Sequence, residues 1–198
     1  MSGRIRGDSM TVRRLLAFTL SALCLGVMAF AQNDKPGAEG EAHPMGPPEE
    51  LKQFDFLVGE WTTDIQIKMT PEGEWTTSPA TMKYEKGMDG SCIRGSFSTD
   101  FMGMPFSGLA TLTYHRMKAK WQMSWIDNMG AYQSLYEGDL NDGILTLEGE
   151  DLAMGQINLV RDITTLKSDT EFDWEVHFSG DGGKTWWTTM KASYKKKS

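Results

Sequence analysis

From Gly59 to its C-terminal end, this chain alternates apolar and polar residues. Trp121, Met123 and Trp125 are separated by polar residues, and residues 172–178 place a large apolar side chain at every second position. A period of two puts successive side chains on opposite faces of a β-strand, so each segment has one apolar and one polar face. The pattern predicts antiparallel strands that pack over a single core.

Short turn signals separate these segments, and counting between them gives about ten strands. An open meander of that size would expose its edge strands, whereas closure into a barrel removes them. We therefore predict an all-β fold, an antiparallel up-and-down barrel whose interior can hold a small ligand. No long crossover connection supports the alternative, a sandwich. The clearest turns are Pro71-Glu72-Gly73, Asp89-Gly90, Asp127-Asn128-Met129-Gly130, Asn141-Asp142-Gly143 and Gly180-Asp181-Gly182-Gly183.

One short helix is expected before the first strand. The run Pro47-Pro48-Glu49-Glu50 places prolines and acids where a helix begins. Leu51, Phe54 and Leu57 follow at helical spacing, and Gly59 ends the segment.

The N-terminus has the features of a secretory signal peptide. Four arginines precede the apolar run 15–30, and Ala29-Phe30-Ala31 supplies a small-x-small cleavage site. We expect a signal peptide over 1–31, a disordered leader over 32–48 and one barrel domain over 49–198. The expected location is secreted or periplasmic, with no membrane span after cleavage.

Charge and composition narrow the possible functions. The formal net charge of -7 argues against nucleic acid as a partner. No pair of histidines has metal-ligand spacing and no nucleophile elbow occurs, so we predict no metal, no cofactor and no catalytic residue. Cys92, the only cysteine after the signal peptide, cannot form an internal disulfide. The sequence favours a binding protein over an enzyme and says nothing of the oligomeric state.

The segment Leu57-Val58-Gly59-Glu60-Trp61 resembles the Gly-x-Trp signature of the calycins, the lipocalins and their relatives. In that group, the tryptophan closes one barrel end and packs on a basic side chain from a late strand. The resemblance implies that Gly59 and Trp61 close the barrel here. Arg161 is the expected stacking partner, because its parity with Ile157 and Ile163 predicts an inward side chain.

A wider set of motifs is similar to an uncharacterised bacterial domain-of-unknown-function family (number fifteen-seventy-nine), over about Leu51 to Lys196. The resemblance implies a calycin-like barrel and carries no activity or catalytic residues. A more distant resemblance is to the haem-binding nitrobindins, but Thr63 and Ile65 stand where their later glycines belong. The family motifs are Leu57-Val58-Gly59-Glu60-Trp61, Gly103-Met104-Pro105-Phe106-Ser107-Gly108, Trp125-Ile126-Asp127-Asn128-Met129, Tyr136-Glu137-Gly138 and Met190-Lys191-Ala192-Ser193-Tyr194-Lys195.

The expected inner face is rich in aromatic residues and methionine, which suit apolar or flat ligands. The same side chains could instead fill the interior at ordinary packing density. Asp127 could orient a ligand or simply accept hydrogen bonds within its own turn. The predicted interior residues are Tyr84, Phe97, Trp121, Met123, Trp125, Asp127, Trp174 and Met190.

The run from Ser179 to Trp186 matches one copy of the Asp-box of sialidase-like propellers. A single copy predicts a hairpin fastener, with Asp181 accepting turn amides and Trp186 packing inward.

The leading hypothesis is an exported barrel that binds a small apolar or aromatic molecule. The alternatives are a filled barrel acting as a protein-interaction module of the cell envelope, and a haem-binding barrel or enzyme.

Overall fold

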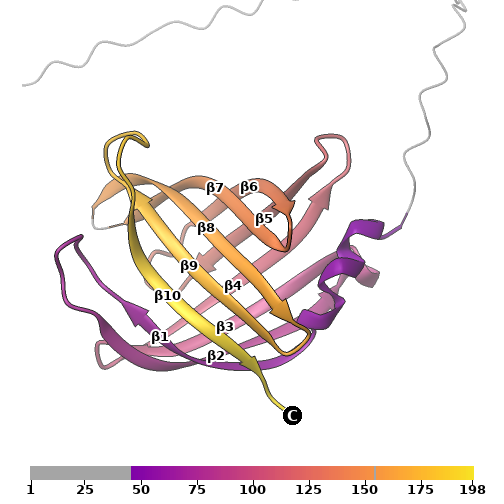
Figure 1. The fold of residues 1–198 in the computed structure, drawn as a ribbon, viewed down its shortest axis with the longest axis horizontal. Coiled ribbons are helices and arrows are strands. Elements are labelled where there is room, and N and C mark those ends of the chain that lie inside the picture. The colour runs from indigo at the N-terminus through magenta and orange to yellow at the C-terminus, as the bar shows by residue number, and fades with distance from the viewer. Residues whose placement is uncertain (1–45, 154) are drawn as a thin grey trace, which may run out of the picture. The chain divides into compact units, whose positions relative to one another are not determined.

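In the computed structural model, which describes residues 46–153 and 155–198, ten antiparallel strands close into one barrel (Figure 1). Each strand pairs with the next along the chain, and β1 also pairs with β10. This confirms the predicted closed, all-β antiparallel architecture. The elements are η1 (Glu49–Leu57), β1 (Gly59–Ile67), β2 (Thr76–Gly87), η2 (Met88–Gly90), β3 (Cys92–Phe101), β4 (Met104–His115), β5 (Lys120–Asp127), β6 (Gln133–Asn141), β7 (Ile144–Ala153), β8 (Gln156–Ser168), β9 (Glu171–Ser179) and β10 (Trp187–Lys196).

The segment predicted as one short helix before the first strand is a 3-10 helix, η1. Its buried residues are Leu51, Phe54 and Leu57. These lie three apart, which aligns side chains on one face at the three residues per turn of a 3-10 helix. A further 3-10 turn, η2, was not predicted.

The predicted signal peptide over 1–31 lies outside the described residues, as does most of the predicted leader over 32–48. The last residues of that leader are described: Pro48 is buried, and the Gly46 carbonyl accepts a hydrogen bond from Arg116. Among the described residues, no helix has both the length and the apolar character needed to cross a membrane.

The helix η1 closes one end of the barrel, on the right in Figure 1, and Trp61 packs beneath it. The Trp61 side chain is completely buried, and its indole Nε1 donates a 2.7 Å hydrogen bond to the carbonyl of Leu57. Phe172 packs edge-on against the indole with ring centroids 4.9 Å apart. Gly59 has a positive φ of 132°, and a Cβ there would meet the Lys196 side chain at 3.0 Å. Glycine suits this position for two reasons: it adopts the positive φ without strain, and it leaves room for the Lys196 side chain.

The basic partner of Trp61 is Lys196 and not Arg161. Lys196 Nζ lies 5.5 Å from the centre of the Trp61 ring and donates to the Phe56 carbonyl at 2.5 Å. Arg161 points outward, stacks on Trp186 at 4.2 Å and pairs with Glu148 at 2.7 Å. The prediction that Arg161 points inward was therefore wrong. Trp186, which was also expected to pack inward, lies outside the barrel because it stacks on Arg161.

The pairing of β8 with β9 determines which side chains of β8 face the barrel interior. Its inward residues include Val160 and Asp162, whereas Ile157 is 67% exposed. Because β8 carries apolar residues on both faces, its own alternation is ambiguous. Asp162 pairs with the inward Val176 of β9, and Val160 pairs with Phe178. Residues opposite one another in a ladder share a face, so the unambiguous pattern of β9 fixes that of β8.

Candidate functional site

The barrel encloses a cavity of about 450 Å³ that runs between its two ends. Phe54 and Leu57 of η1 form its floor, and Met69, Met129 and Leu152 lie at the opposite, mouth end. Those three mouth residues are about half exposed. A volume of this size falls within the usual range for small-molecule sites. A cavity of this volume argues against the alternative in which side chains fill the interior at ordinary packing density.

Seven of the eight predicted interior residues line the cavity. Trp121 does not: it is buried closer to η1, where its ring contacts Phe54 edge-on at 4.7 Å and Tyr114 at 5.3 Å. It belongs to the packed end of the barrel. The seven lining residues are Tyr84, Phe97, Met123, Trp125, Asp127, Trp174 and Met190.

The most unusual cavity residue is Asp162, whose side chain is buried in an apolar wall and is 7% exposed as a residue. Trp174 Nε1 donates a 2.8 Å hydrogen bond to Oδ2. Burial raises the pKa of the Asp162 carboxyl to about 7, and the indole hydrogen bond opposes that rise only in part. The group therefore changes charge near neutral pH.

Three tyrosines of the cavity wall are influenced by the charge of this carboxyl. Burial raises the pKa of Tyr136 to about 12 and raises that of Tyr84 further. It also raises the pKa of Tyr194 well above its ordinary value, and the charge of Asp162 adds to the shift in all three. Each phenol is therefore neutral at physiological pH and can donate or accept a hydrogen bond.

A second polar group lies at the mouth end. The Asp151 carboxylate accepts hydrogen bonds from the Tyr132 hydroxyl at Oδ1 and from the Tyr136 hydroxyl at Oδ2, the latter at 2.8 Å. Burial raises the pKa of Asp151, and the nearby charge of Asp127 adds to the rise.

Asp127 performs the turn role that was one of its two expected roles. Its Oδ1 accepts the backbone amides of Met129 and Gly130 at 2.9 and 2.7 Å, and its Oδ2 accepts Trp125 Nε1 at 3.0 Å. The carboxylate also lines the cavity, so it fixes the Trp125 ring in the wall.

Sequence reasoning missed Asp162, Asp151, Tyr136 and Tyr194 as cavity residues. Asp162 was missed because the wrong parity was chosen for β8. The pairing of β8 with β9 could have found it, since every second residue of 172–178 is large and apolar. Nothing in the sequence showed that Asp151 meets two phenols, because those contacts depend on the register between strands.

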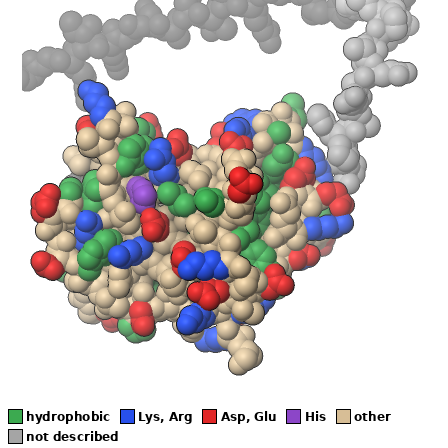
Figure 2. Space-filling view, viewed as in Figure 1, with side chains coloured by type: hydrophobic (Ala, Val, Ile, Leu, Met, Phe, Trp, Pro, Cys, Tyr) green, Lys and Arg blue, Asp and Glu red, His purple; other side chains and the backbone are tan. Residues whose placement is uncertain are grey.

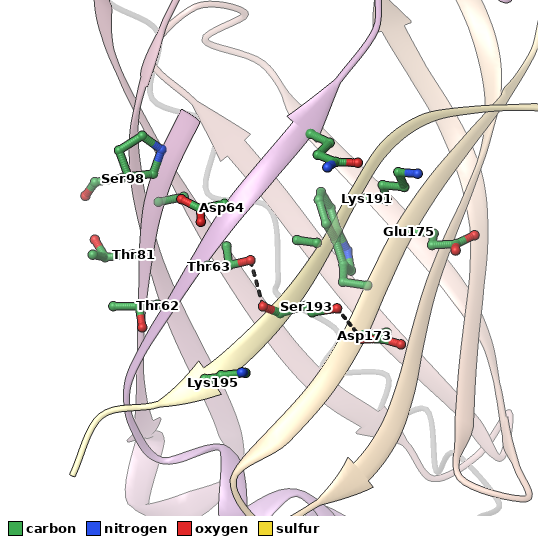
Figure 3. A pocket seen from close by; sticks show the side chains of 15 residues that line it. Thr62, Thr63, Asp64, Thr81, Ser98, Asp173, Glu175, Lys191, Ser193 and Lys195 are labelled. Atoms are coloured by element: carbon green, nitrogen blue, oxygen red, sulfur yellow. Dashed lines mark hydrogen bonds between the residues drawn. The ribbon is translucent and has the colours of Figure 1, made fainter. Parts of the chain in front are cut away.

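A shallow groove of about 820 Å³ lies on the outer face of the barrel, over β1, β2, β9 and β10 (Figure 3). Its walls are mostly hydroxyl and charged side chains. Thr63 donates to the Ser193 carbonyl at 2.8 Å, and the Ser193 hydroxyl donates to Asp173 at 2.6 Å. Some of the polar lining is thus paired within the groove, which is open to solvent. Figure 2 shows charged side chains of both signs interspersed over one outer face.

The two described histidines, which are the residues considered as ligands of a haem iron, do not face the interior. His177 contacts Glu175 at 2.9 Å on the outer face, and His115 accepts the Lys118 amide at 3.3 Å. Neither lines the cavity. Within the described part of the chain, no three His, Cys, Asp or Glu side chains group as metal ligands would. The interior thus offers no described histidine to a haem iron.

The fold and the cavity define a class: a closed antiparallel barrel that encloses an apolar compartment beneath a tryptophan-sealed end. Within that class, the chain belongs to the family described as "Protein of unknown function (DUF1579)", whose model matches residues 46–196. No curated protein is detectably similar in sequence.

Several solved structures match this chain, among them the two that follow. The crystal structure of Rv2717c from M. tuberculosis aligns with a TM-score of 0.55 at 11% identity, covering 77% of this chain and all of that one. A redesigned beta barrel aligns with a TM-score of 0.39 at 14% identity, covering 72% of this chain and 93% of the other. The first likeness shows a shared barrel fold.

Proposed function

We propose that this protein binds one small apolar or aromatic molecule non-covalently inside its barrel. The observation that carries this proposal is the cavity of about 450 Å³, which is walled by aromatic rings and methionines. Met82, Met123 and Met190 contribute flexible thioethers that can adjust to several ligand shapes. The barrel would then serve as a container, as the resemblance to the calycins implies.

N-phenyl-1-naphthylamine, a neutral lipophilic fluorophore, tests the proposal. We expect a saturable rise in its fluorescence with one site per chain. Ala110 lines the cavity and Leu109, its neighbour on β4, is 58% exposed on the outer face. Ala110→Phe should therefore fill the compartment and weaken binding by about tenfold or more, whereas Leu109→Phe should leave it unchanged. Equal effects from the two variants would contradict an internal site.

A role in protein interaction is the second candidate. Apolar side chains around the mouth support it, because Met102 is 73% exposed, Met104 53% and Ile157 67%. These lie on the turns and strand ends next to the cavity mouth. Under this alternative, Met104→Gln would reduce association with a partner while Ala110→Phe would not.

We also propose that the chain is exported. The basic, apolar and small-x-small segments of residues 1–31 support this. Mass spectrometry of the mature protein should find Gln32 as its first residue. An intact N-terminus would refute the proposal.

A further inference from the structure

The charges that line the cavity are all of one sign. Asp127, Asp151 and Asp162 are in its wall, whereas none of its lining residues is Lys, Arg or His. Aromatic rings face the same space, including Trp125, Trp174 and four tyrosines. Carboxylates in surroundings of low dielectric attract a cation strongly and repel an anion. We therefore expect this interior to bind fatty acids and similar anions weakly.

Two of the three carboxylates are already engaged. Both oxygens of Asp127 accept hydrogen bonds, from two turn amides and an indole. Both oxygens of Asp151 accept hydrogen bonds from phenols. These hydrogen bonds hold the mouth end together and already stabilise both carboxylates.

Asp162 is different. Among the described residues, its only hydrogen-bond donor is Trp174, which binds Oδ2 and leaves Oδ1 without a donor. The hydroxyls of Tyr84 and Tyr194 have no hydrogen-bond partner within the described part of the chain, although both residues line the cavity. A buried acid and two unengaged hydroxyls, which line the same cavity and feel the charge of the acid, form a polar region in a mostly apolar compartment. Such a region orients a ligand that carries one polar group.

We propose that the cavity ligand is a lipophilic primary amine, whose ammonium group binds Asp162 Oδ1 and whose apolar body lies among the aromatic and methionine side chains. This inference rests on the proposed function and specifies its ligand class. The ammonium supplies the hydrogen-bond donor that Oδ1 lacks, in a charge-assisted bond of the stronger kind.

Three ligands of equal chain length test the charge preference: decylamine, decanol and sodium decanoate. Each is titrated against protein loaded with N-phenyl-1-naphthylamine, and displacement of the fluorophore is measured at pH 8. We expect decylamine to bind about tenfold more tightly than decanol, because a hydrogen bond to a charged group exceeds a neutral one by that order. Decanoate should bind more weakly than decanol.

Asp162→Asn separates the interior charge from the acidic surface. Asparagine can still accept the Trp174 hydrogen bond, so the variant removes the charge and keeps the shape. It should lower decylamine affinity by about tenfold and leave decanol affinity within about twofold. Asp64→Asn, which removes the same charge from the exposed outer face of β1, is the matched control and should change neither.

The pH dependence supplies an independent readout. The titratable groups that face Asp162 are Tyr84 on β2, Tyr136 on β6 and Tyr194 on β10, and all three remain neutral between pH 6 and pH 8. Decylamine affinity should therefore fall by about fivefold from pH 8 to pH 6, as Asp162 takes up a proton, and Asp162→Asn should abolish this dependence.

Equal affinity for decylamine and decanol, or an unchanged decylamine affinity in Asp162→Asn, would overturn the amine proposal while leaving the internal site intact. Failure of the wild-type protein to bind the fluorophore or any of the three ligands would overturn both proposals.

Discussion

The Asp162 carboxyl should destabilise the folded protein at neutral and alkaline pH. Asp162→Asn should therefore raise the free energy of unfolding at these pH values. Burial raises the pKa of the Asp162 carboxyl from the ordinary 3.8 to about 7. Below the lower value, both the folded and unfolded chains hold the proton, so the group has no effect. Between the two values, only the folded chain holds it, and stability falls as pH rises. Above about pH 7, the full cost of the buried charge applies.

The size of the cost follows from the shift. Three pKa units at about 1.4 kcal/mol each give about 4 kcal/mol, as an order of magnitude. The free energy of unfolding of Asp162→Asn should therefore match that of the wild type near pH 4. It should exceed the wild-type value by about 4 kcal/mol at pH 8.

Urea unfolding followed by tryptophan fluorescence, repeated between pH 4 and pH 8, measures this difference. Asp64→Asn is again the control, because it removes an equal charge from the exposed surface. A difference between Asp162→Asn and the wild type that stays constant across this pH range would refute the reasoning. A loss of stability at pH 8 would show that the carboxylate has a compensating partner.

Three further predictions concern the frame of the barrel. Trp61→Ala should cost about 3–5 kcal/mol in urea unfolding, as for a large buried aromatic ring, and a loss below about 1 kcal/mol would show that Trp61 does not seal the barrel. Gly138→Ala should lower Tm sharply, because its Cβ would lie 1.8 Å from the Thr146 carbonyl oxygen, whereas Gly180→Ala meets nothing closer than 3.5 Å and should be nearly neutral. Asp181→Ala should lower Tm at pH 7, because hydrogen bonds from Thr185 and other turn groups hold the pKa of Asp181 well below its usual range. That stabilisation is present at neutral pH and is lost as the carboxylate is protonated, so the difference in Tm should narrow below about pH 4.

The barrel itself was predictable because strand period and turn chemistry are local properties. The inner faces of β5 and β9 alternate without ambiguity. The Asp-Asn-Met-Gly turn marks the hairpin of β5 and β6, and the Asn-Asp-Gly turn marks that of β6 and β7. The Asp-box run also folds as a hairpin fastener, with Asp181 accepting hydrogen bonds from Ser179 and Thr185. Each of these inferences used residues within a few positions of one another.

The site was harder to predict because its chemistry depends on register between strands. β8 carries apolar residues on both faces, so local patterning chose Arg161 and overlooked Asp162. The cavity volume depends on how ten strands tilt and how far η1 enters the barrel, and no alternation pattern encodes either. Trp121 shows the same limit: its inward parity was correct, but its distance along the barrel axis places it in the sealed end, against Phe54.

Under the amine proposal, the charge of Asp162 would serve ligand binding while it lowers the stability of the folded barrel. An asparagine would keep the Trp174 hydrogen bond and remove the charge, so the acid is the less stable choice at neutral pH. A buried carboxylate that lowers stability, where asparagine could accept the same hydrogen bond, is consistent with the proposed role in ligand binding.

A crystal structure of the protein with decylamine tests the central claim most directly. The account predicts an alkyl chain inside the barrel, among Met82, Phe97 and Met123, with its nitrogen within about 3.2 Å of Asp162 Oδ1. An alkyl chain lying instead in the outer groove over β1 and β10, with the interior unchanged, would contradict it.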